Sequence, residues 1–236
     1  MTERLYLDFN ATAKIRPEVI DALGSAMAQV GNASSVHGAG RTARKDVEDA
    51  RRKVAVLVGA APDQVVFTSG GTEADNLAVD GVVRSTGCLP VCSAVEHPAV
   101  LAPVADAGGI VVSTDEGGRI DLGALAEVLS SVDGIGLVSV MLANNETGVV
   151  NDLESVAALL AEAAPDAVLH TDAVQAVAWM DLTEACRGAG LVSLTGHKFG
   201  GPKGAGKWLN DHVDDWSEYW DWGEKKFVIP NYELKR

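Results

Sequence analysis

Short apolar runs recur between residues 5 and 195, and longer stretches with helical spacing separate them. Each run is rich in Val, Ile or Leu, which is typical of strands buried on both faces. We expect strands at residues 65–68, 91–94, 110–113, 136–141, 168–171 and 191–194. Strands that alternate with helices predict an α/β domain with three layers, in which helices cover both faces of a mainly parallel sheet.

The apolar spacing predicts helices at residues 17–30, 42–58, 73–84, 99–107, 122–129 and 153–164. The composition changes at residue 207, because four of the five tryptophans lie in the last 30 residues. We therefore expect one large domain at residues 1–206 and a divergent Trp-rich tail at residues 207–236. Apolar residues at helical spacing predict a short amphipathic helix over 208–220, and residues 227–229 are a candidate small strand.

The charge and the cysteines exclude several classes of partner. The net charge of −14 argues against binding to nucleic acid or to an anionic membrane. No stretch has the apolar length of a signal core or a membrane span, so we expect a cytoplasmic protein. The three cysteines do not form a disulfide framework, and Cys88 and Cys92 have no second pair with which to build a metal site.

A glycine-containing turn, Ser69-Gly70-Gly71-Thr72-Glu73, lies between a predicted strand and a predicted helix. The free amide groups at a helix N-terminus attract phosphate, and the Thr72 hydroxyl can donate one more hydrogen bond. A glycine turn capped by Ser or Thr is also a common way to begin a helix. Taken alone, this motif fits either interpretation.

Other polar clusters also follow predicted strands. Asp172 and Gln175 come at the end of the run near residue 170, where the carboxyl ends of strands line a ligand crevice. Lys198, with Thr195 and His197 just before it, follows the last strand, and a lysine can form an imine with a carbonyl compound when its pKa is lowered. An ordinary loop carboxylate and a solvated loop lysine remain the alternatives.

Two further clusters contain His97 and Asn145. A histidine can stack on an aromatic cofactor and move protons, and an asparagine can bond a ring hydroxyl. Both segments could equally be plain turns. Together, the five clusters supply a phosphate seat, a histidine, an asparagine, a carboxylate and a lysine, which are the parts that a pyridoxal phosphate (PLP) site needs.

The chain resembles the NifS/IscS cysteine desulfurases of the class V aminotransferase group, which have PLP fold type I. The resemblance covers about residues 4–206. It rests on the stretches YLDFNATA, GNASSVHGAGR, VVFTSGGTEADNLA, EHPAV, NNETGV, HTDAVQAV and TGHKFGGPKGAG.

The resemblance implies roles for individual residues. Lys198 would be the Schiff-base lysine and Asp172 the partner of the pyridine nitrogen, with Gln175 near the ring oxygen. His97 would stack on the ring and transfer protons, and Asn145 would contact the ring substituents. The phosphate would be held by Gly71, Thr72, Thr195 and His197, although the family usually has Ser where Thr195 stands.

The implied reaction converts L-cysteine to L-alanine and passes the sulfur on, for iron-sulfur cluster or thio-cofactor assembly. The resemblance also implies a homodimer and a sulfur-acceptor or scaffold protein as partner. The family's nucleophilic cysteine lies well beyond the lysine motif, and this chain has no cysteine after Cys186. The expectation is therefore a truncated, impaired desulfurase without the small C-terminal domain. The alternatives are a cysteine or selenocysteine lyase, an aminotransferase, or a non-catalytic binding partner.

Overall fold

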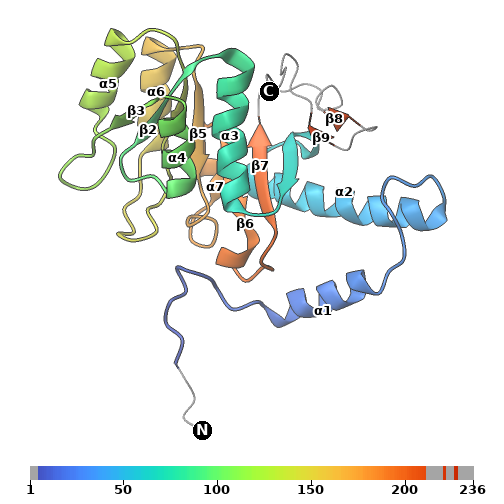
Figure 1. The fold of residues 1–236 in the computed structure, drawn as a ribbon. Coiled ribbons are helices and arrows are strands. Elements are labelled where there is room, and N and C mark those ends of the chain that lie inside the picture. The colour runs from blue at the N-terminus through green and yellow to red at the C-terminus, as the bar shows by residue number, and fades with distance from the viewer. Residues whose placement is uncertain (1–4, 211–219, 222–225, 228–236) are drawn as a thin grey trace.

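The computed structural model describes residues 5–210, 220–221 and 226–227. A seven-stranded sheet with the order β1-β7-β6-β5-β4-β2-β3 forms its centre (Figure 1). Neighbouring strands among β2, β3, β4, β5 and β6 are parallel, whereas β7 is antiparallel to both β6 and β1. The strands are β1 Val65–Thr68, β2 Leu89–Ser93, β3 Ile110–Val112, β4 Ile135–Ser139, β5 Val168–Asp172, β6 Leu191–Thr195 and β7 Gly206–Asn210.

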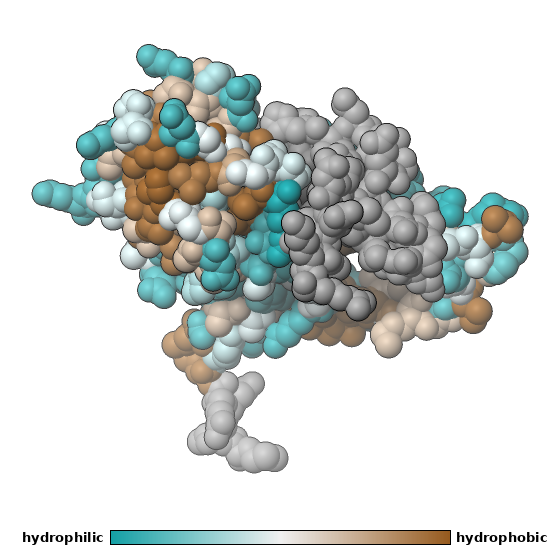
Figure 2. Space-filling view, turned by 45° about the horizontal axis from the view of Figure 1, so that its top comes forward, coloured by the Kyte–Doolittle hydropathy of each residue, from teal (hydrophilic) through white to brown (hydrophobic). Residues whose placement is uncertain are grey.

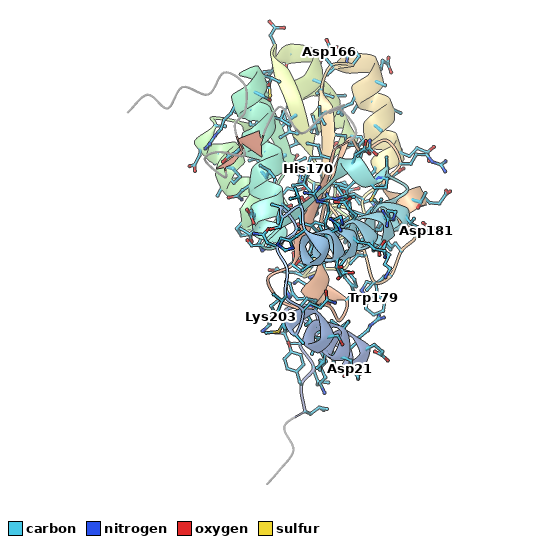
Figure 3. All side chains as sticks on the ribbon, turned by 90° about the vertical axis from the view of Figure 1, so that its right-hand side faces the viewer. Asp21, Asp166, His170, Trp179, Asp181 and Lys203 are labelled. Atoms are coloured by element: carbon cyan, nitrogen blue, oxygen red, sulfur yellow. The ribbon has the colours of Figure 1, made fainter. Side chains whose placement is uncertain are left out.

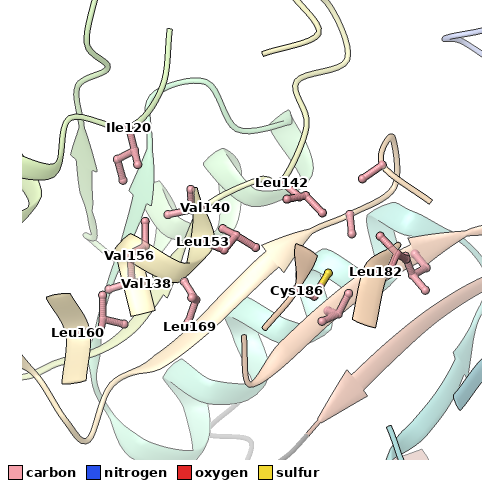
Figure 4. Close-up of a cluster of buried hydrophobic side chains, with 14 of the residues drawn as sticks. Ile120, Val138, Val140, Leu142, Leu153, Val156, Leu160, Leu169, Leu182 and Cys186 are labelled. Carbon is pink, nitrogen blue, oxygen red and sulfur yellow. The ribbon is translucent and has the colours of Figure 1, made fainter. Parts of the chain in front are cut away.

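Helices cover both faces of this sheet and create two apolar cores. On one face, α3 and α4 pack over a cluster that includes Ala78, Val100 and Leu137. On the other face, α2, α5, α6 and α7 contribute side chains to a cluster that includes Val138 and Leu169. Figure 4 shows these two residues with side chains of α6 and α7. The helices are α1 Pro17–Met27, α2 Gly38–Val58, α3 Gly71–Thr86, α4 Pro98–Asp106, α5 Leu122–Ser131, α6 Leu153–Ala163 and α7 Leu182–Ala185, with short 3₁₀ turns at Pro62–Gln64 and Gly196–Lys198.

Local sequence explains where several helices begin and end. Asp121 accepts hydrogen bonds from two backbone amides at the start of α5, and Asp152 accepts one from Ser155 at the start of α6. The helix α2 ends at Gly59, whose φ of 72° is the left-handed conformation that glycine adopts without strain. These caps fix the ends of helices whose apolar faces cover the sheet.

The predicted three-layer α/β architecture is confirmed, and each predicted strand and helix from residue 17 to 195 has a counterpart within a few residues. The missed helix and strands are α7, β7 and a short strand at Trp220–Asp221. Residues 208–210 lie in β7 and residue 220 lies in that short strand, so the helix expected over 208–220 is wrong at both ends. The facing edges of β1 and β6 both carry backbone groups that need hydrogen-bond partners. A strand between them pairs with both edges, which is why this segment is β7 and not a helix.

The strand β7 also crosses the boundary that we expected between residues 206 and 207. Two further short strands, β8 Trp220–Asp221 and β9 Lys226–Phe227, pair with each other, and β9 contains the first residue of the candidate strand at 227–229. The rest of that strand and the middle of the predicted tail helix lie outside the described residues.

The segment before the sheet contributes little to either core. No residue of α1 is buried, and α1 and the outer part of α2 extend away from the sheet (Figure 1). Figure 2 shows apolar side chains next to the grey residues at its lower edge. Leu5 and Leu7 are among the exposed large apolar residues of this segment. Within the described residues, no helix is long and apolar enough to cross a membrane.

Candidate active site

The polar clusters predicted at strand ends meet at one edge of the sheet. β1, β2, β4, β5 and β6 all end there, because the antiparallel β7 leaves β1 running in the same direction as the others. A cavity of about 210 Å³ opens at this edge. It is lined by Gly71, Thr72, Asp75, His97, Met141, Asn145, Asp172, Val174, Gln175, Thr195, His197 and Lys198. Every residue predicted to bind the cofactor is among them.

The start of α3 forms one wall of the cavity at Gly71 and Thr72. The first amide groups of a helix have no acceptor within the helix, so they can donate to an anion. The Glu73 carboxylate holds the turn by accepting from the amide and the hydroxyl of Ser69, and these bonds lower the pKa of Glu73. A Cβ on Gly206 would lie 2.2 Å from the Gly70 carbonyl oxygen, so β7 packs directly against this turn.

Lys198 enters the cavity from the 3₁₀ turn after β6. Its ammonium group donates to the backbone oxygen of Asn10, and so does the Gln175 amide, at 3.0 Å. The Asn10 side chain in turn donates to the Asn145 backbone oxygen at 3.2 Å. The N-terminal segment therefore connects three of the predicted site residues. Burial lowers the pKa of Lys198, and the nearby carboxylates of Asp172 and Asp8 oppose that shift.

Asp172 ends β5 and lies at the floor of the cavity, with 5% of its surface exposed. Its Oδ1 accepts from the Val174 amide at 2.9 Å. Burial raises the pKa of Asp172, and the Val174 bond, His97 and Lys198 counteract this rise only in part. A positive charge next to Asp172 would therefore be favourable, because it would compensate the buried carboxylate.

The histidines hold different parts of the wall. His97 caps α4 by accepting from the Ala99 amide at Nδ1, 3.1 Å away. The Nδ1 of His197 lies 3.2 Å from the Thr12 hydroxyl, and burial lowers the pKa of His197. The hydroxyl of Thr195 donates to the Ala205 backbone oxygen at 3.2 Å. Loop contacts thus fix both rings and the threonine at the cavity.

Sequence reasoning missed several residues of this site. Asp75, Met141 and Val174 line the cavity, and Glu96 lies buried behind it, accepting from the Met141 amide. Asp75 could have been found from its spacing, because a residue four positions after Gly71 lies on the same face of a helix. The buried Glu96 has no comparable pattern, since its partner is 45 residues away.

Comparison with known proteins shows the family to which the chain belongs. Residues 5–210 match the family model described as aminotransferase class-V. The chain is 40% identical over 216 residues to an IscS-like cysteine desulfurase of Mycobacterium tuberculosis, a match that covers 86% of this chain and 54% of that protein. It is 44% identical over 213 residues to a cysteine desulfurase of Rhodobacter capsulatus, with 86% and 54% covered. The chain thus spans about half the length of these curated relatives.

Solved structures share the fold. A NifS-like protein superposes with a TM-score of 0.86 at 28% identity, and the match covers 96% of this chain and 64% of that one. A structure described as SspA in complex with cysteine has a TM-score of 0.80 at 27% identity, with 89% and 62% covered.

Proposed function

The chain belongs to the class-V aminotransferase family and is a homologue of IscS- and NifS-like cysteine desulfurases, and from this premise we propose that its cavity binds PLP and acts on L-cysteine. The observation that carries the proposal is that Lys198 and Asp172 line one cavity together with the predicted phosphate seat. A PLP site requires an amine for the aldehyde and a carboxylate for the pyridine nitrogen. This cavity contains both.

The residues present fit the cofactor chemically. Asp172 is a buried carboxylate whose pKa is raised by burial, so a protonated ring nitrogen would supply the positive charge that its surroundings lack. The lowered pKa of Lys198 increases the fraction of neutral amine, which is the form that attacks a carbonyl carbon. The α3 N-terminus with Thr72, and Thr195 and His197 opposite, would hold the phosphate.

Each side chain then has a defined task. Asp172 would keep the proton on the ring nitrogen, and PLP, when bound, would supply the electron sink for bond breaking at the substrate. Lys198 would hold the cofactor and then move a proton at the substrate Cα. His97 would shuttle a proton. Gln175 and Asn145 would help to orient the ring.

The names of the relatives support L-cysteine as substrate, since several are cysteine desulfurases and one structure contains cysteine. In the balanced reaction, cysteine and a thiol yield alanine and a persulfide. No cysteine of the described residues lines the cavity, and Cys92 and Cys186 are buried. We therefore assign the accepting thiol to a group outside the described residues, such as a cysteine of a sulfur-acceptor protein. The same observation favours a cysteine or selenocysteine lyase as the second candidate, because such a reaction needs no thiol from the enzyme.

The proposal extends to a homodimer. The segment from residue 5 to 36 exposes many large apolar side chains, including Leu5, Ile20 and Met27, and α1 has no buried residue. An exposed apolar surface of this kind marks an interaction site.

The visible spectrum tests the cofactor assignment. Protein purified with added PLP should absorb near about 420 nm, as expected for the cofactor joined to a lysine. Lys198→Ala should lose this band, and borohydride reduction followed by peptide mapping should find the cofactor on Lys198 of the unchanged protein. The matched control is Lys203→Ala, in the same loop but outside the cavity lining. A reducible cofactor link that persists in Lys198→Ala would refute the assignment.

Release of alanine tests the substrate. With cysteine and a small added thiol, the PLP-loaded protein should form alanine and persulfide in equal amounts. Alanine with an equal amount of elemental sulfur, formed without dependence on the thiol, would instead support the lyase. A protein that binds PLP but releases neither product would support a non-catalytic binding role.

A further inference from the structure

A buried row of polar side chains lies beneath α3 and leads to the floor of the cavity. Ser139 lies two positions after Leu137 on β4, and Ser193 lies two positions after Leu191 on β6, so both serines share the sheet face of these leucines. His170 lies between the two serines on β5. The Oγ of Ser139 is 2.8 Å from His170 Nδ1, and the Oγ of Ser193 is 3.0 Å from His170 Nε2. Figure 3 shows His170 in the interior of the molecule.

Asp75 joins this row from the second turn of α3. Its side chain is 2% exposed, lines the cavity and bonds to Ser193. Its Oδ1 has no hydrogen-bond partner within the described part of the chain. Nε2 of His170 is 3.8 Å from Oδ1, which is too long for a hydrogen bond.

No positive charge compensates Asp75 within this row. Burial lowers the pKa of His170 to about 3, so its ring is neutral. Burial, and next the negative charge of Asp172, raise the pKa of Asp75 to about 9, with a smaller contribution from Glu96. The other ionisable groups around the cavity come from three segments that pack against α3. They are Glu96 and His97 after β2, His170 and Asp172 on β5, and His197 and Lys198 after β6.

We propose that Asp75 is a positioning residue that remains a neutral acid, so that Asp172 is the anion facing the cofactor ring. This inference deepens the proposed function, on which it rests for the identity of the cofactor. A buried carboxylate needs a cation or several donors, and Asp75 has neither. Two adjacent buried carboxyls cannot both ionise cheaply. The one that can pair with a cationic ring is Asp172, and the proton remains on Asp75.

The protein without added PLP gives the first test. Asp75 holds its proton in the folded state up to about pH 9, whereas the unfolded residue loses it near its ordinary value of 3.8. The stability contributed by this group therefore decreases as the pH rises between these values. The folding constant should fall about tenfold per pH unit for this one proton. In urea unfolding of Asp75→Asn between pH 6 and 8.5, the decrease of the folding constant with pH should lack this one-proton contribution.

Asp80→Asn is the matched control, because Asp80 lies on the same helix with a side chain that is 41% exposed. Its slope should equal that of the unchanged protein. If Asp75→Asn retains the full slope, Asp75 is not the proton-holding group and the inference is overturned. Asp75→Leu, similar in volume and unable to ionise, serves if the asparagine variant does not fold.

Titration with PLP gives the second test, which distinguishes a positioning role of Asp75 from a merely structural one. Asp172→Asn removes the anion and should weaken binding of PLP strongly at pH 7.5. Asp75→Asn replaces one neutral group by another, so its effect on the Kd should be at least about tenfold smaller. Equal losses in the two variants would contradict the inference.

The two proposals can fail separately. If the pH slope flattens in Asp75→Asn but no variant binds PLP, the protonation of Asp75 stands and the cofactor proposal fails. If PLP binds to Lys198 but the slope does not change, the cofactor proposal stands and Asp75 has another role.

Discussion

Single residues of this site depend on their neighbours for their chemistry. Lys198 reaches the cavity with its amine bonded to a backbone oxygen of Asn10, and Asp172 is buried at the end of a strand. Burial lowers the pKa of the first and raises the pKa of the second. Both shifts favour the neutral forms in the protein alone, and a cationic ring between them would reverse the effect on Asp172.

His170 makes a prediction of pH dependence at the same scale. Its pKa is lowered from 6.5 to about 3 by burial, so the stability that it contributes is present above pH 6.5 and is lost as the pH falls toward 3. His170→Gln should reduce stability at pH 7 by about 2 kcal/mol through lost bonds to Ser139 and Ser193. It should also make the decrease between pH 6.5 and 4 shallower in urea unfolding. An unchanged acid slope would show that His170 is not buried as a neutral ring.

At the scale of elements, the site depends on the contact between β7 and the turn before α3. Gly206 pairs with Thr68 on one side and Thr195 on the other, and a Cβ on it would lie 2.2 Å from the oxygen of Gly70. The turn that we propose to hold the phosphate is therefore in direct contact with β7. A segment after the lysine motif thus contacts one wall of the cavity, although every residue that lines the cavity precedes this segment.

Gly206→Ala tests this dependence. The new methyl group should force the turn away from β7, reduce the free energy of unfolding by about 1–3 kcal/mol and weaken PLP binding about tenfold. Gly81→Ala is the control within α3, because a Cβ there would meet nothing within 4 Å. It should stabilise the protein by about 0.5–1 kcal/mol. Calorimetry and PLP titration measure both effects, and an unaffected Gly206→Ala would contradict the proposed coupling.

For the molecule as a whole, the segment from residue 5 to 36 carries more than half of the exposed large apolar side chains of the described residues. If it forms the dimer, Ile20→Lys with Met27→Lys should weaken association by roughly 4 kcal/mol, which is about a thousandfold in Kd. Sedimentation at several concentrations measures this change. Trp179→Lys is the control, since Trp179 is 82% exposed elsewhere on the surface. A similar loss from Trp179→Lys, or none from the double variant, would place the interface elsewhere.

Local sequence patterns predicted most of the helices and strands and most of the candidate site. Buried strands and capped helices are recognised from neighbouring residues, so their positions were predictable. The polar clusters follow directly after apolar runs, and parallel strands bring such ends to one edge. That reasoning predicted most of the residues that line the cavity around Lys198, but not Asp75, Met141 or Val174.

Three features follow only from the tertiary structure. They are the order of the strands, the insertion of β7 between β1 and β6, and the protonation of the buried carboxyl groups. β7 is a strand because β1 and β6 offer it hydrogen bonds on both sides, although its own residues suggested a helix. Asp75 and Glu96 acquire raised pKa values because distant segments exclude water from them. Pairing and burial are properties of contacts far apart in sequence, and local patterns carry no information about them.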